Sequence, residues 1–229
     1  MKLLTITSIA IVSMATLGSC KKADNKTGGL IVSLRGTAEV EHAGARKPVK
    51  IGDQFESGDT VYTGADSVAV IAIRGTLAQA EVQPNASFMI TSTGADTDVK
   101  LDKGNMWLSV AKRASNEKFT VHTPTAVAGV RGTKFYTAQQ EDITVVCHCE
   151  GDVEFASGKD YNAVHHTDTV VFTKNGKTVT IDAAELKGIV YSHAHSMLED
   201  SPLGTKGQMS EETKKKVFAI AQKKFDELK

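Results

Sequence analysis

The strongest constraint on the fold is a series of short strand-like runs that fills residues 30–179. The runs are rich in Val, Ile, Thr and Phe, many alternate apolar with polar residues, and Gly, Asp and Asn punctuate them. Regularly spaced short strands with glycine turns are typical of an all-β sandwich or roll. The sequence therefore predicts a mainly β domain over residues 30–179, with strands at 30–34, 38–41, 68–73, 77–82, 87–91, 105–110, 117–122, 134–138, 143–149 and 169–172.

Residues 180–229 change to a helical pattern. Asp182 with Glu185 three residues later fits a capped helix start, and apolar residues follow at helical spacing up to Pro202. Residues 188–191 fit a strand equally well, so both interpretations stay open. Ser210 caps a second helix whose apolar stripe consists of Phe218, Ala221, Phe225 and Leu228. We expect a helical C-terminal extension that docks on its own domain.

The first residues have the form of an export signal. Residues 1–19 begin with Met1 and the basic Lys2 and continue with an apolar stretch that ends in Leu17-Gly18-Ser19. Cys20 follows, and this pattern resembles a bacterial lipobox, in which the cysteine thiol receives a diacylglyceryl group and becomes the first mature residue. A membrane-spanning anchor would need about 20 apolar residues, which exceeds this stretch. A plain secreted protein is the other alternative.

A lipobox implies that the mature chain, from Cys20 onward, lies outside the cytoplasm at the bacterial envelope. Residues 20–29 are polar and predict a flexible lipidated tether. Lys21 follows the cysteine, which favours the outer membrane by the sorting rule of enteric bacteria. The chain has 27 basic and 27 acidic side chains, so no basic field for nucleic acid is expected.

Several motifs occur in a fixed order through the β region. Residues 52–64 contain Gly58-Asp59, residues 84–87 read Pro-Asn-Ala-Ser, and residues 103–107 read Lys-Gly-Asn-Met-Trp. Residues 123–133 then run from Thr-Pro to Val-Arg-Gly-Thr, and residues 149–153 end the series. This succession resembles the FecR domain family. The motif residues are Gly58, Asp59, Thr123, Pro124, Arg131, Gly132 and Thr133.

The chemistry of these motif residues is mainly that of turns. Pro124 fixes its own φ, and Gly132 permits a bend or a close backbone approach. Arg131 lies between an apolar residue and a glycine, which favours pairing inside the fold. Presentation of its guanidinium to an anionic ligand is the alternative.

The resemblance implies a role in signalling. The expected lipobox restricts which part of that role this chain could perform. In the best-known FecR proteins a cytoplasmic segment controls a sigma factor, and a membrane helix joins it to a periplasmic region that receives a signal. A lipobox at the start of the chain leaves no such segment, so we expect no direct contact with a sigma factor. The expected function is a non-catalytic ligand- or partner-binding module, acting on an envelope protein or the cell wall. A structural envelope protein that binds only through residues 210–229 is a rival.

Cys147-His148-Cys149 is a second candidate site. In a regular strand both thiols lie on one face, where they could be soft metal ligands, with His165 and His166 a loop away. Two buried core cysteines and a strained disulfide are the alternatives. The metal interpretation predicts a metal- or haem-handling lipoprotein.

The sequence contains no Gly-x-Ser-x-Gly elbow, P-loop or zinc-protease motif. We therefore expect no enzyme activity and no required cofactor.

Overall fold

The structure is a computed structural model that describes residues 28–111, 114, 116–130, 132–150, 153–157, 160–162, 169–182, 185 and 211–228. For residues 147–150, 153–157, 160–162, 169, 182, 211, 213 and 214 it describes the backbone only. The expected signal peptide, Cys20 and most of the tether lie outside these ranges. No helix among the described residues is long and apolar enough to cross a membrane.

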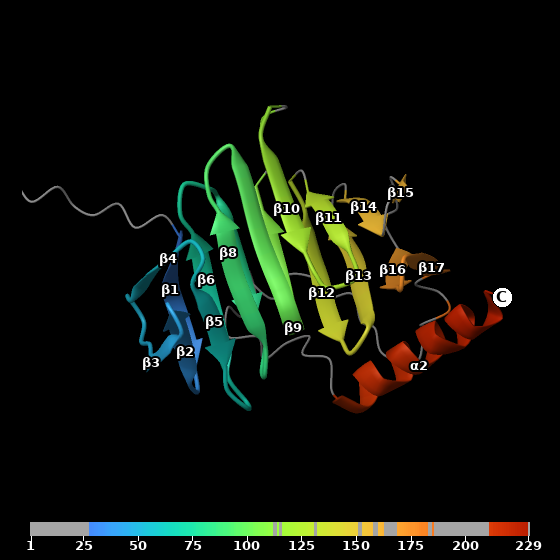
Figure 1. Ribbon diagram of the computed structural model, residues 1–229, viewed down its shortest axis with the longest axis horizontal. Helices are drawn as coiled ribbons and strands as arrows, with labels where there is room; N and C mark the ends of the chain where they lie inside the picture. Colours follow the sequence, from blue (N-terminus) through green and yellow to red (C-terminus); the bar gives the residue numbers. More distant parts are fainter. Residues whose placement is uncertain are drawn as a thin grey trace, which may run out of the picture.

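Two β-sheets pack face to face, and one long strand belongs to both (Figure 1). Sheet A has the order β4 (Gln54–Glu56), β1 (Gly28–Arg35), β6 (Val68–Ile73), β7 (Ala78–Val82), second half of β9 (Asp96–Val110), β12 (Lys134–Gln140), β13 (Ile143–Glu150), β16 (Thr169–Lys174) and β17 (Lys177–Asp182). Sheet B has the order β3 (Ala45–Pro48), β2 (Ala38–His42), β5 (Thr60–Thr63), β8 (Ser87–Ser92), first half of β9, β10 (Lys118–His122), β11 (Val127–Val130), β14 (Val153–Ser157) and β15 (Asp160–Asn162). Only the β9–β10 pairing is parallel among these described strands. The predicted mainly β sandwich is confirmed.

Gly104 is the point at which β9 passes from one sheet to the other. Residues up to Lys103 pair with β8, whereas residues from Gly104 onward pair with β12. Gly104 has φ +87°, and a Cβ built on it would lie 2.5 Å from Cβ of Ala86. Glycine is required here because the backbone has a positive φ and because any side chain at this position would collide with Ala86.

The main core lies between the two sheets and follows the alternation of the strands. Ile71 and Ile73 from sheet A meet Phe88, Ile90 and Leu101 from sheet B, and all five are buried. Alternate residues on each strand supply this layer, which is why the sequence runs show a period of two. The other face of each sheet is therefore available for a helix or a ligand.

The helix α2 (Glu211–Glu227) covers part of the outer face of sheet A, beside β16 and β17 (Figure 1). Phe218 and Phe225 are buried in a second apolar cluster that includes Tyr136 and Phe172. The rings of Phe172 and Phe218 meet edge to face, with centroids 6.3 Å apart. The predicted docking of this helix on its own domain is confirmed, although Leu228 remains 43% exposed.

Two expected boundaries differ from those of the structure. β1 begins at Gly28, inside the range expected as tether, because Gly28 and Gly29 pair with β4. β17 continues to Asp182, which pairs with Thr169 instead of beginning a helix. The strand therefore crosses the expected boundary at residue 180, since pairing with β16 outweighs the capping pattern. Residues 183, 184 and 186–210 lie outside the described ranges.

Candidate functional site

Asp59, from the first of the motifs, holds a turn together. Its Oδ2 accepts a hydrogen bond from the backbone N–H of Glu56 at 2.8 Å, and its Oδ1 lies 2.6 Å from Nδ1 of His42. Gly58 has φ +93° and donates its N–H to the carbonyl of Ile90. Gly58 and Asp59 therefore make these hydrogen bonds with other residues of the domain, which is a structural role.

Threonines of the Thr-Pro motif join the two sheets. Thr123 and Thr125 lie in the turn between β10 and β11 of sheet B, on either side of Pro124. Their hydroxyl oxygens lie 2.7 and 2.5 Å from that of Thr144 on β13 of sheet A. Thr144 donates in turn to Oε1 of Gln139. The motif therefore forms a hydroxyl network across the end of the sandwich.

The last motif residues lie where the chain returns from sheet B to sheet A. Gly132 has φ +76°. Thr133 is buried, and its carbonyl accepts the N–H of Val110 at 2.9 Å. Arg131 lies outside the described residues, so its role remains a prediction.

The cysteine candidates lie on β13, near the end of the strand. Lys134 pairs with Glu150 and Phe135 pairs with His148, which leaves Cys149 as the extra residue of a β-bulge. The bulge interrupts the regular alternation on which the two-thiol hypothesis depends. His165 and His166 lie outside the described residues, as do the cysteine side chains. No described group of three or more His, Cys, Asp or Glu has the arrangement of a metal site, and the metal hypothesis stays a prediction.

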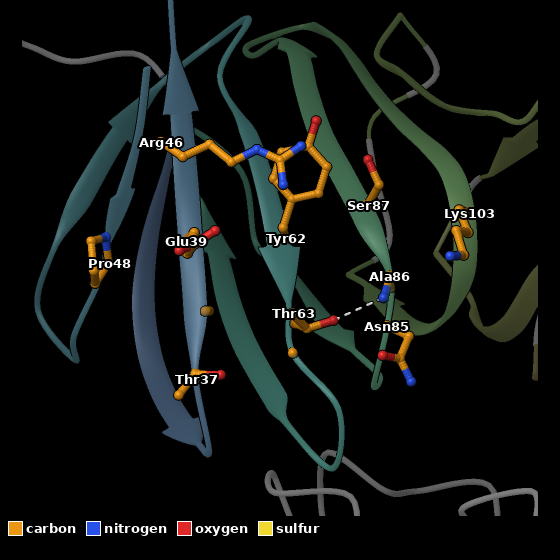
Figure 2. Close-up of a pocket in the computed structure, with 12 residues that line it drawn as sticks. Thr37, Glu39, Arg46, Pro48, Tyr62, Thr63, Asn85, Ala86, Ser87 and Lys103 are labelled. Atoms are coloured by element: carbon orange, nitrogen blue, oxygen red, sulfur yellow. Dashed lines mark hydrogen bonds between the residues drawn. The ribbon is translucent and has the colours of Figure 1, made fainter. Parts of the chain in front are cut away.

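A pocket on the outer face of sheet B is the candidate site that the structure adds. It has a volume of about 590 Å³ and crosses five strands. The register places one residue from each strand directly beside the next, and all five line the pocket: Pro48 on β3, Glu39 on β2, Tyr62 on β5, Ser87 on β8 and Lys103 on β9. We call these five residues the cross-strand row. Figure 2 shows Glu39, Tyr62, Ser87 and Lys103 in this order from left to right.

Arg46 covers the aromatic ring of the row. Its guanidinium carbon lies 3.6 Å from the centroid of the Tyr62 ring, and its Nε donates a 2.7 Å hydrogen bond to Oε2 of Glu41. The hydrogen bond to Glu41 raises the pKa of Arg46, so the guanidinium stays charged. The stack of Arg46 on Tyr62 presents a planar surface with hydrogen-bond donors at its edge.

The floor of the pocket is held by backbone and side-chain hydrogen bonds. Thr63 donates from Oγ1 to the carbonyl of Gln83 at 2.6 Å and accepts the N–H of Ala86 at 3.0 Å. The second of these bonds is drawn in Figure 2. Both residues of this bond are buried. The pocket therefore has a fixed floor and exposed, charged walls, which suits binding more than chemistry.

Sequence reasoning missed this pocket for a physical reason. The residues of the row come from positions 39 to 103, and only strand register brings them side by side. Two of the strands involved, β3 and β5, are short and were not among the expected strands. The half-buried Tyr62, in the first motif, was the one available signal.

Comparisons with known proteins concern the β region. Residues 59–154 match the model of the family described as FecR protein. No curated protein sequence matches the chain. Two crystal structures of a candidate anti-sigma factor from Parabacteroides distasonis ATCC 8503 are similar, at 2.50 and 1.65 Å resolution.

Both structural similarities are partial. The first has a TM-score of 0.47 and 15% identity, covering 54% of this chain and 59% of the other. The second has a TM-score of 0.47 and 16% identity, covering 56% and 65%. The similarity spans less than two thirds of those proteins in each case. The family model matches residues 59–154, and most of the ordered motifs lie in this part of the chain.

Proposed function

We propose that this chain is a non-catalytic binding module of the bacterial envelope, which senses a ligand or partner through the pocket on sheet B. The observation that carries the proposal is the cross-strand row, because it joins an aromatic platform and exposed charges over a fixed floor. Such a combination orients a ligand without providing a nucleophile and a paired base. The FecR-family match supports a sensing role.

The proposal includes a lipid anchor at Cys20. The Leu-Gly-Ser-Cys pattern at residues 17–20 supports it, and Lys21 favours the outer membrane. With this anchor the β domain lies outside the cytoplasm, where its partners are an envelope protein or the cell wall. Neither nucleic acid nor a sigma factor would be in direct reach.

Labelling cells with radioactive palmitate tests the anchor. We expect label in the wild-type protein and none in a Cys20→Ala variant, which would also leave the membrane fraction. Equal labelling of the two proteins would contradict the lipid anchor, and it would leave the hypothesis of a binding pocket on sheet B unaffected.

Capture from envelope extracts tests the pocket. The wild-type full-length chain is compared with Tyr62→Ala, and Leu77→Ala is the matched control because Leu77 is an apolar residue, 84% exposed, outside the pocket. We expect Tyr62→Ala to lose the captured species and Leu77→Ala to retain it. Full capture by Tyr62→Ala would exclude the pocket as the binding site.

A further inference from the structure

We infer that the pocket on sheet B recognises a dipolar ligand, a short extended peptide whose amino group pairs with Glu39 and whose carboxylate pairs with Lys103. The inference rests on the proposed function, because it names the ligand class of the same pocket.

The two charges stand at a defined separation. Glu39, Tyr62, Ser87 and Lys103 lie on four neighbouring strands in direct register. Three strand spacings of about 4.8 Å put the Glu39 and Lys103 backbones roughly 14 Å apart. An extended peptide advances about 3.3 to 3.6 Å per residue, so its two ends span this distance with about four residues.

Glu39 and Lys103 are also the charges available to a ligand. Both side chains are exposed and have no hydrogen bond or ion pair with any described residue. Neighbouring charges on the same sheet are already paired: Arg46 with Glu41 at 2.7 Å, and Lys100 with Asp102 at 2.7 Å. An acid at one end and a base at the other therefore favour a ligand that carries both signs.

The middle of the row suits a peptide backbone. The stack of Arg46 on Tyr62 offers a planar surface, and Ser87 offers a hydroxyl with no partner in the described part of the chain. The peptide would lie across the strands and contact their side chains. Addition as a further strand beside β3 is disfavoured, because that edge carries Lys47 and Pro48.

The expected affinity is weak and depends on both ends. Exposed ion pairs contribute little, so loss of one pair should raise the Kd about two- to fivefold. Each ion pair can be removed in two independent ways, by blocking the charged end of the peptide or by neutralising the side chain of the protein. Agreement between the two changes in Kd makes a modest effect measurable.

The test is an NMR titration of the ¹⁵N-labelled full-length protein in detergent micelles. The probes are alanine peptides of two to six residues with free ends, and the same peptides acetylated at the amino end or amidated at the carboxyl end. We expect the tightest binding at about four residues, with shifts centred on Tyr62 and Ser87. Each block should weaken binding about two- to fivefold.

Matched variants assign each end. Glu39→Gln should bind free and acetylated peptides equally, and Lys103→Gln should bind free and amidated peptides equally. Lys100→Gln, a control on the same strand outside the pocket, should retain both differences. Binding that is indifferent to both blocks, or equal effects in Lys100→Gln, would overturn the inference.

One further outcome separates this inference from the proposed function. If no alanine peptide binds while Tyr62→Ala still loses envelope capture, the pocket is a binding site but the dipolar peptide is wrong. If Tyr62→Ala retains full capture, the proposed function itself fails.

Discussion

Gln83 donates a hydrogen bond from Nε2 to Oε1 of Glu81 at 2.8 Å, and both side chains are buried. Ala80 and Val82 belong to the core between the sheets, so Glu81 points to the opposite, outer face of sheet A. The second carboxyl oxygen of Glu81 has no hydrogen bond within the described part of the chain. Burial raises the pKa of Glu81 to about 8, which outweighs the opposing effects of Gln83 and Arg35.

This buried carboxyl should make stability depend on pH. Folded Glu81 keeps its proton at neutral pH, whereas the unfolded chain loses it near pH 4.5. The free energy of unfolding should therefore fall as pH rises from about 4.5 to about 8, by at most about 1.4 kcal/mol per unit. Urea unfolding across this range should show a flatter profile for Glu81→Gln. The exposed Glu39→Gln should keep the wild-type slope, and equal slopes in all three proteins would refute the assignment.

Gly104→Ala should destabilise the sandwich at its corner. The substitution places alanine at positive φ, which costs about 1–2 kcal/mol, and overpacks Ala86 by about 1–3 kcal/mol more. Gly44→Ala is the matched control, because Gly44 has φ +80° and open space around it. Chemical denaturation should show a clearly larger loss for Gly104→Ala. Comparable losses would mean that the contact with Ala86 relaxes freely.

Thr144→Val should loosen the end of the sandwich where the Thr-Pro motif lies. Valine keeps the shape but leaves Thr123, Thr125 and Gln139 without their shared partner, at an expected cost of about 1–3 kcal/mol. A double-mutant cycle with Thr125→Val should give a non-additive result. Thr91→Val, at an exposed threonine, should change the free energy of unfolding little. Additive effects of Thr125 and Thr144 would argue against a connected network.

Phe218→Ala should detach α2 from sheet A. Phe218 is 7% exposed and meets Phe172, so its truncation should cost about 3 kcal/mol. Leu228→Ala, directly after the helix, should be nearly neutral because Leu228 is 43% exposed. Hydrogen exchange of the α2 amides would measure the detachment directly. Unchanged protection in Phe218→Ala would show that the other apolar residues suffice.

The sequence predicts the apolar strands and misses short or mostly polar ones. Residues 68–73 form β6 as expected, since all six are apolar and five of them are buried. The short strand β3 is exposed throughout and has no apolar pattern to detect. The first half of β9, from Asp96, was missed because Val99 and Leu101 are the only apolar residues among residues 96–103.

The candidate site was harder to predict than the fold. The motif residues Asp59 and Thr123 stand out in the sequence, yet their contacts lie inside the protein. The residues of the pocket carry no local pattern, because their proximity depends on long-range register. In the sequence, Lys103 stands out only as the first residue of the motif at residues 103–107. Its neighbour Gly104 is the point at which β9 changes sheets.

Strand β9 belongs to both sheets and passes from sheet B to sheet A at Gly104. Lys103 lines the pocket on sheet B, while Asn105 donates to the hydroxyl of Tyr136 at 2.7 Å, within the apolar cluster under α2. Gly104 alone separates these two residues. The pocket on sheet B and the apolar cluster that holds the C-terminal helix are therefore built from residues two positions apart on the same strand.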